Sequence, residues 1–199
     1  MAILSCANSG RLFWLGRYTE RVFTGIRALS GRSGAWAEAE SKLCFDGKNP
    51  ESLYCSLMYA YDNAIVLRDE IGSDTFSYIQ MAVYEMNSAR KSPAPMLQLQ
   101  KVNDNIAAFW GMADDAISDE NVRGIIKLGK RIERVDLYAR GDAGNDEIRR
   151  EVTRLTYRIE KTGLHYDPET LSALNELAEA EDIDRPEMIR KVESLVDFP

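Results

Sequence analysis

The sequence predicts an all-α fold, a single-domain antiparallel helical bundle of seven or eight helices with an internal duplicated Glu-Arg helix. Apolar residues recur at helical spacing through most of the chain, and no stretch shows the sustained alternation of a β-strand. Short connections containing glycine or proline separate the apolar stripes, which favours antiparallel neighbours. The 199 residues suit one domain over 1–199 with a substantial core.

The expected helices follow from these stripes and their end signals. The first covers residues 12–29. Asn49 as cap and Pro50 in the first turn predict the start of the second helix, which Gly72 ends. Asp74 is the expected cap of the third. The remaining helices are expected over about 96–112, 119–139, 146–162, 168–180 and 186–196.

The net charge of −7 is concentrated at the carboxyl end. Residues 166–199 contain ten acidic side chains against three basic ones, so the preceding part of the chain is balanced. This balance gives no electrostatic case for binding nucleic acid or a membrane surface. The acidic C-terminal helices, 166–199, are expected to be peripheral to the bundle.

The cysteines and the histidine exclude several kinds of site. Cys6, Cys44 and Cys55 are odd in number and lack C-x-x-C spacing, which favours buried free thiols over disulfides or a zinc site. His165 is the single histidine, so no His-rich metal site is possible. We therefore expect no metal and no cofactor. No basic leader precedes an apolar run and no long apolar span occurs, which predicts a cytoplasmic protein.

An internal repeat is the most informative feature of the sequence. Leu15–Val22 reads Leu-Gly-Arg-Tyr-Thr-Glu-Arg-Val, and Leu128–Val135 reads Leu-Gly-Lys-Arg-Ile-Glu-Arg-Val, with five of eight positions identical. The flanks extend the match, since Phe13 corresponds to Ile126 and Arg27 to Arg140. Two helices are therefore expected to occupy equivalent places in the bundle.

The repeat also predicts a buried charged face. Each copy carries an apolar residue, a cation and a glutamate on the side opposite its main apolar stripe. If this face is partly buried, Glu20 and Glu133 need cationic partners on another helix, because an unpaired buried carboxylate is costly. Gly16 and Gly129 support close packing, since a glycine inside a helix costs about 1 kcal/mol and is usually kept for close approach. Ordinary solvated ion pairs are the alternative interpretation.

These residues resemble the alpha-E family, a set of bacterial helical proteins named for a Glu-Arg motif. The resemblance rests on Leu12–Arg21, Asn49–Ser52, Asp62–Ala64, Arg68–Ser73 and the second Glu-Arg segment, Leu128–Val135. These segments span about residues 9–140.

The chain departs from the family pattern at Asp62, where glutamate is more frequent, and at Lys130-Arg131, which replaces Arg-Tyr. Family members are commonly encoded beside ATP-grasp peptide ligases and transglutaminase-like proteases. The resemblance therefore implies a partner of one of these kinds and a role in making or modifying a peptide or amide.

The candidate site is a ligand-binding or buried ion-pair cluster, with no catalytic residue assigned. Its members are the motif residues and three polar residues of the second expected helix: Arg17, Glu20, Arg21, Asn63, Arg68, Asp69, Lys130, Glu133 and Arg134. Arginines suit a carboxylate, a phosphate or a peptide ligand, and no nucleophile stands beside a histidine base.

The leading hypothesis is an accessory or binding protein of an ATP-grasp-linked pathway of peptide or amide synthesis or modification. An enzyme that uses the Glu/Arg cluster in amide-bond chemistry and a purely structural scaffold are the alternatives.

Overall fold

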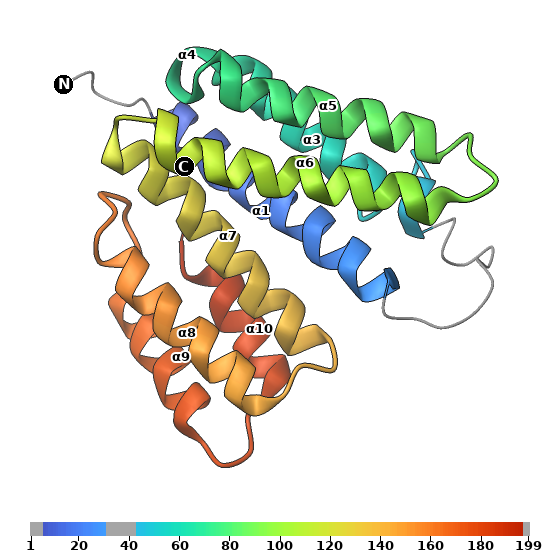
Figure 1. Ribbon diagram of the computed structural model, residues 1–199. Coiled ribbons are helices and arrows are strands. Elements are labelled where there is room, and N and C mark those ends of the chain that lie inside the picture. Colours follow the sequence, from blue (N-terminus) through green and yellow to red (C-terminus); the bar gives the residue numbers. More distant parts are fainter. Residues whose placement is uncertain (1–5, 31–42, 197–199) are drawn as a thin grey trace. The chain divides into compact units, whose positions relative to one another are not determined.

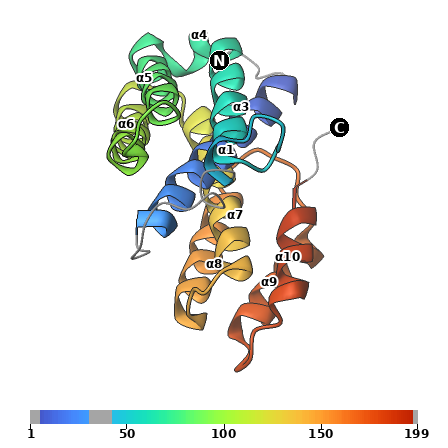
Figure 2. The same cartoon turned by 90° about the vertical axis from the view of Figure 1, so that its right-hand side faces the viewer.

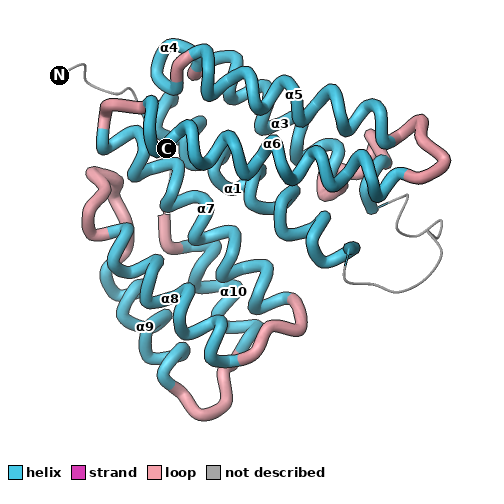
Figure 3. The backbone as a smooth tube through the Cα atoms, in the orientation of Figure 1, coloured by secondary structure: helices cyan, strands magenta, loops and turns pink. Residues whose placement is uncertain are grey.

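The described part of the chain is all-helical. The computed structural model describes residues 6–30 and 43–196 (Figure 1). The helices are α1 (Cys6–Ser30), α3 (Leu53–Val66), α4 (Arg68–Ile71), α5 (Ser73–Ala89), α6 (Pro95–Ala116), α7 (Glu120–Arg140), α8 (Asn145–Ile159), α9 (Pro168–Glu179) and α10 (Arg185–Ser194). Short loops join most of them (Figure 3). The all-α prediction is confirmed, and among the described residues the one β-bridge pairs Tyr166 with Val196.

Helix α3 begins three residues later than expected. The Ser52 hydroxyl accepts a hydrogen bond from the Cys55 N–H at 3.1 Å, which makes Ser52 the N-cap. Asn49 instead uses its side-chain oxygen locally, accepting from the Glu51 N–H at 3.0 Å in the turn before the helix. The cap prediction at Asn49 was therefore wrong.

The expected second helix is divided near its end. Helix α3 ends at Val66 and the short α4 follows, because Leu67 leaves the regular helical backbone. Gly72 then separates α4 from α5 with φ of +82°, a conformation that favours glycine. Gly72 is also the N-cap of α5, so Asp74 lies in the first turn and not at the predicted cap.

The described residues form two compact units. The prediction of a single domain over 1–199 stays a prediction. The terminal unit joins the part of α1 up to Arg17 to the chain from Gly124 onward. The central unit is Tyr18–Arg123. Helices α1 and α7 each contribute to both units, so each unit is described by itself.

The central unit packs α1 (from Tyr18), α3, α5 and α6 around an apolar core. Helices α5 and α6 run side by side after a short turn (Figures 1 and 2). Gly25 of α1 allows close approach to α3, because a Cβ there would lie 2.6 Å from Leu53 Cδ2. The core includes Val22, Ile26, Leu29, Leu53, Leu57, Ala82, Met86, Leu99, Val102 and Ile106.

The terminal unit includes the two acidic C-terminal helices as packed elements. Helices α9 and α10 bury Leu171, Leu174, Ala178, Met188 and Val192. Figure 2 shows the two helices as neighbours.

Arginine contacts to backbone carbonyl oxygens also hold these helices. Arg185 donates hydrogen bonds to the carbonyl oxygens of Gly141 at 2.7 Å and Ala143 at 2.6 Å, and Arg149 donates to that of Ala178 at 2.9 Å. The acidic side chains of α9 lie mainly on its exposed side, whereas every third or fourth residue is apolar and buried. Helix α9 therefore packs through its apolar stripe, and the expected peripheral placement of these acidic helices stays a prediction.

Two of the three cysteines lie in the described side chains. Cys44 and Cys55 are free and buried, as expected. The side chain of Cys6 lies outside the described ones. None of the helices in the described residues combines the length and apolar character needed to cross a bilayer.

Candidate functional site

Helices α1 and α7 cross within the terminal unit at the two repeat glycines. A Cβ built on Gly16 would overlap the carbonyl oxygen of Ile126, and one built on Gly129 would overlap that of Phe13. These obstacles are backbone atoms, which cannot rotate away as a side chain can. Both glycines are therefore required for the two helix backbones to touch.

The crossing has the pseudo-two-fold symmetry that the sequence repeat implies. Gly16 faces Ile126 and the backbone nitrogen of Lys130, whereas Gly129 faces Phe13 and the backbone nitrogen of Arg17. Phe13 is the repeat counterpart of Ile126, and Arg17 is that of Lys130. The two copies thus contact each other through equivalent backbone positions.

A buried ion pair lies one turn from this crossing. Arg17 Nε donates a hydrogen bond to Glu133 Oε2 at 2.7 Å. Glu133 is 0% exposed and Arg17 is 7% exposed. Arg17 also stacks over Trp14, with its guanidinium carbon 4.9 Å from the ring centroid. The pair joins residues 116 positions apart and links α1 to α7.

A second carboxylate, Asp136, adjoins this pair. One of its oxygens lies 4.0 Å from an Arg17 guanidinium nitrogen, and the other accepts a hydrogen bond from Arg140 Nε at 2.9 Å. Burial and the neighbouring Glu133 carboxylate raise the pKa of Asp136, against the opposing effect of Arg140 and Arg17. Two carboxylates and two guanidiniums therefore share this side of α7.

Arg134, the arginine of the second Glu-Arg pair, turns to a different carboxylate, Glu151 of α8. Glu151 is buried and lies 3.8 Å from Arg134, 2.7 Å from Arg131 and 2.6 Å from Arg154. Burial alone would raise the pKa of Glu151, but the three guanidiniums outweigh it and hold this pKa below its usual value. The cluster joins α7 to α8.

The first Glu-Arg pair lies in the central unit. Glu20 is fully buried, and its Oε1 accepts a hydrogen bond from the Thr24 hydroxyl at 2.8 Å. Arg21 is half-buried, with its guanidinium carbon 5.9 Å from the centroid of the Tyr18 ring. Burial of both motif glutamates agrees with the charged face expected from the sequence.

The remaining predicted site residues differ in exposure. Asn63 of α3 is half-buried, whereas Arg68 and Asp69 of α4 are exposed. Arg68 lies over the Phe76 ring at 5.3 Å and donates weakly to the Ser73 hydroxyl at 3.4 Å. In the terminal unit Lys130 is half-buried.

The structure brings Arg17 and Glu133 together and directs Arg134 elsewhere, to Glu151. The expected convergence of Arg17, Arg21, Arg68, Lys130 and Arg134 on one anion cavity stays a prediction.

Five charged residues of the terminal unit were missed by the sequence reasoning: Arg131, Asp136, Arg140, Glu151 and Arg154. Asp136 follows Glu133 by three positions, but its repeat counterpart is Phe23, so comparison of the copies hid it. Arg131 likewise corresponds to Tyr18. Glu151 lies outside the repeat; the available signal was an acidic residue on the apolar stripe that runs from Ile148 to Ile159.

The site is a set of charged contacts between helices. Carboxylates and guanidiniums neutralise one another at α1–α7 and α7–α8, and both contacts lie mostly out of solvent. Within the described residues, no three His, Cys, Asp or Glu side chains come together as possible metal ligands. The site and fold define a class: a helical protein organised around buried Glu-Arg contacts.

The chain belongs to the Alpha-E family, described as a predicted alpha-helical domain with a conserved ER motif. The family model matches residues 27–143, which include Glu133-Arg134 and begin after Glu20-Arg21. No curated protein and no solved structure matches the chain.

Proposed function

We propose that this chain is a non-catalytic accessory or binding protein in a pathway that makes or modifies peptide or amide bonds. One observation carries the non-catalytic part: the motif carboxylate of Glu133 is 0% exposed and bound by Arg17 across the glycine crossing. A general acid or base must come within hydrogen-bond reach of its substrate. A carboxylate packed between two touching helices is better suited to holding them together.

The pathway part of the proposal rests on the resemblance to alpha-E proteins. Because members are commonly encoded beside ATP-grasp ligases and transglutaminase-like proteases, the proposed partner is one of these proteins. The chain then acts by docking the ligase or by presenting an anionic or peptide intermediate to it.

One observation favours the alternative, an enzyme that uses the Glu/Arg cluster. Asp136 is a buried carboxyl whose pKa is raised, and it adjoins Glu133, whose carboxylate is bound by Arg17. Pairs of carboxyls in unlike environments are a common arrangement in acid–base catalysis. The alternative therefore assigns proton transfer to Asp136.

A reconstitution with the ATP-grasp ligase encoded nearest to this chain tests the proposal. Formation of the amide product is measured with the ligase alone, this chain alone and both together. We expect no product from the chain alone, a measurable complex by light scattering, and full support of the ligase by Asp136→Asn.

Product formed by the chain alone, and lost in Asp136→Asn with an unchanged unfolding transition, would establish the enzyme alternative instead. Absence of a complex with either kind of partner would refute the pathway assignment. Asp142→Asn, which changes an exposed acid after α7, is the matched control for loss of one carboxylate.

A further inference from the structure

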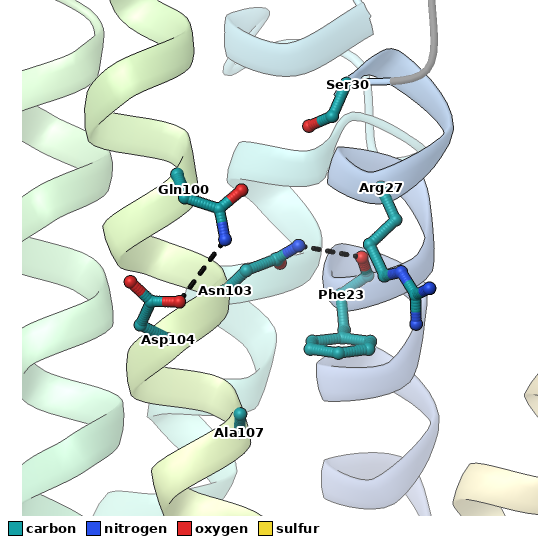
Figure 4. Close-up of a pocket in the computed structure, with 7 residues that line it drawn as sticks. All are labelled: Phe23, Arg27, Ser30, Gln100, Asn103, Asp104 and Ala107. Carbon is teal, nitrogen blue, oxygen red and sulfur yellow. Dashed lines mark hydrogen bonds between the residues drawn. The ribbon is translucent and has the colours of Figure 1, made fainter.

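A polar groove of about 350 Å³ lies between α1 and α6 of the central unit (Figure 4). Its size is within the range of small-molecule sites. Phe23, Arg27 and Ser30 of α1 and Gln100, Asn103, Asp104 and Ala107 of α6 line it. The groove contains none of the Glu-Arg motif residues, so its function does not depend on the proposed function.

The two sides of the groove carry opposite charges. Arg27 on α1 lies over the Phe23 ring, with its guanidinium carbon 5.6 Å from the centroid. Asp104 on α6 accepts a hydrogen bond from Gln100 at 3.3 Å. Both charged residues are exposed, and within the described residues neither forms an ion pair. A ligand carrying one charge of each sign matches this arrangement.

Asn103, at the base of the groove, is a buried polar residue. It is 3% exposed, and its Nδ2 donates a hydrogen bond to the Phe23 carbonyl oxygen at 3.2 Å, crossing from α6 to α1 (Figure 4). Its Oδ1 is buried and accepts no hydrogen bond from any described residue. Leaving a buried acceptor unsatisfied costs about 1–3 kcal/mol.

Leucine at position 103 would avoid this cost. The neighbouring buried residues of α6 are Leu99, Val102 and Ile106, so an apolar side chain would extend the core. Polar groups kept at such a cost are typical of functional sites. The Asn103 carboxamide lies beneath the groove and turns about a soft torsion, which allows Oδ1 to meet a donor that enters from the groove.

We propose that the α1–α6 groove binds a small zwitterion with an α-amino and a carboxylate group, either a free amino acid or a short peptide. Arg27 binds the carboxylate, Asp104 binds the ammonium group, and Asn103 Oδ1 accepts a further N–H from the same ammonium. Phe23 and Ala107 provide the apolar contact for the ligand side chain.

Titration calorimetry on the full chain tests this site with four probes: L-leucine, L-alanyl-L-leucine, N-acetyl-L-leucine and L-leucinamide. We expect L-leucine or the dipeptide to bind with a Kd of about 1 mM or below, and the stronger of the two identifies the source of the ligand. N-acetyl-L-leucine lacks the ammonium and L-leucinamide lacks the carboxylate, so each should bind about tenfold or more weakly.

Variants locate the binding in the groove. Arg27→Gln and Asp104→Asn change exposed side chains and should weaken binding about tenfold to a hundredfold with unchanged unfolding. Asn103→Leu should abolish binding while raising the melting temperature. Asp115→Asn, an exposed acid on the same helix that does not line the groove, is the control and should bind normally.

Two results would overturn the proposal. The first is the absence of heat with both zwitterions at about 10 mM probe. The second is equal binding of the blocked and unblocked probes, or equal loss of binding in Asp115→Asn. Because no ligase is present in this experiment, its failure is distinct from failure of the proposed function.

Discussion

The two copies of the Glu-Arg motif share burial and differ in the residues that flank them. Glu133 and Glu20 are both 0% exposed. Glu133 is bound by the Arg17 guanidinium at 2.7 Å, whereas Glu20 accepts from the Thr24 hydroxyl at 2.8 Å. The Thr24 contact is specific to the first copy, since Leu137, which has no hydroxyl, occupies the position of Thr24 in the second copy.

The residues around the two motif arginines differ as well. Arg134 lies near Glu151 together with Arg131, whereas the counterpart of Arg131 is Tyr18, whose ring lies beneath Arg21. Repetition therefore preserved the helix and the burial of its glutamate, while substitution around the motif changed some of the residues that it contacts.

Truncation after Gly163 should have the largest effect on stability. It removes α9 and α10, whose buried side chains each contribute about 1.5–3 kcal/mol when large and apolar. We expect the terminal unit to lose its cooperative transition in scanning calorimetry. A truncated chain that unfolds as sharply as the full chain would show that these helices are peripheral.

Loss of the Arg17 guanidinium at Glu133 should cost more stability than loss of the Thr24 hydroxyl at Glu20. Arg17→Met leaves the Glu133 carboxylate buried without its guanidinium and should cost about 3–5 kcal/mol. Thr24→Val removes one hydrogen bond to Glu20 and should cost about 1.5–3 kcal/mol. Urea unfolding measures both. Equal costs would mean that the buried ion pair stabilises the protein no more than the Thr24 hydrogen bond does.

Substitution by alanine should destabilise the protein at a crossing glycine and stabilise it at a glycine with open space around it. Gly129→Ala gains helix propensity but forces the Phe13 backbone away, with a net cost of about 1–3 kcal/mol. Gly111→Ala on α6 is the control, since nothing lies within 4 Å of its Cβ position. That variant should gain about 0.5–1 kcal/mol. Stabilisation by both substitutions would show that the helices can separate freely.

The two buried acids should make the free energy of unfolding change with pH in opposite directions. The pKa of Glu151 is lowered in the folded protein. Its contribution to stability is therefore present above the pKa that it has in the unfolded chain, and is lost as pH falls through the folded pKa. The pKa of Asp136 is raised, so stability falls as pH rises from its unfolded value through the folded pKa.

Urea unfolding at a series of acidic pH values checks both signs. Glu151→Gln should remove the part of the stability loss on acidification that Glu151 causes. Asp136→Asn should remove the part of the stability loss on raising the pH that Asp136 causes. The same slope in both variants would contradict the assigned shifts.

The sequence was most informative where one local pattern decides the structure. Apolar periodicity predicted the helices, and a glycine repeated at the same place in both copies predicted close packing. Local signals were weaker at helix starts, because Asn49 and Ser52 are both good caps and tertiary contacts select between them.

The partners within the site could not be derived from spacing. Arg17 meets Glu133 across 116 positions, and local periodicity carries no information about such distant pairs. Asp136 was hidden because its counterpart is Phe23. The groove around Asn103 was also missed. A single asparagine within an apolar helix stripe does not indicate a groove until the facing helix is known.

A double-mutant cycle on Arg17 and Glu133 tests most directly whether this buried pair is a structural element of the crossing. Unfolding free energies are measured for Arg17→Met, Glu133→Leu and the double variant. We expect a coupling energy of about 2–3 kcal/mol, with the double variant less destabilised than the sum of the single ones, because no charge is then left buried without its partner. A coupling below about 0.5 kcal/mol would contradict the account.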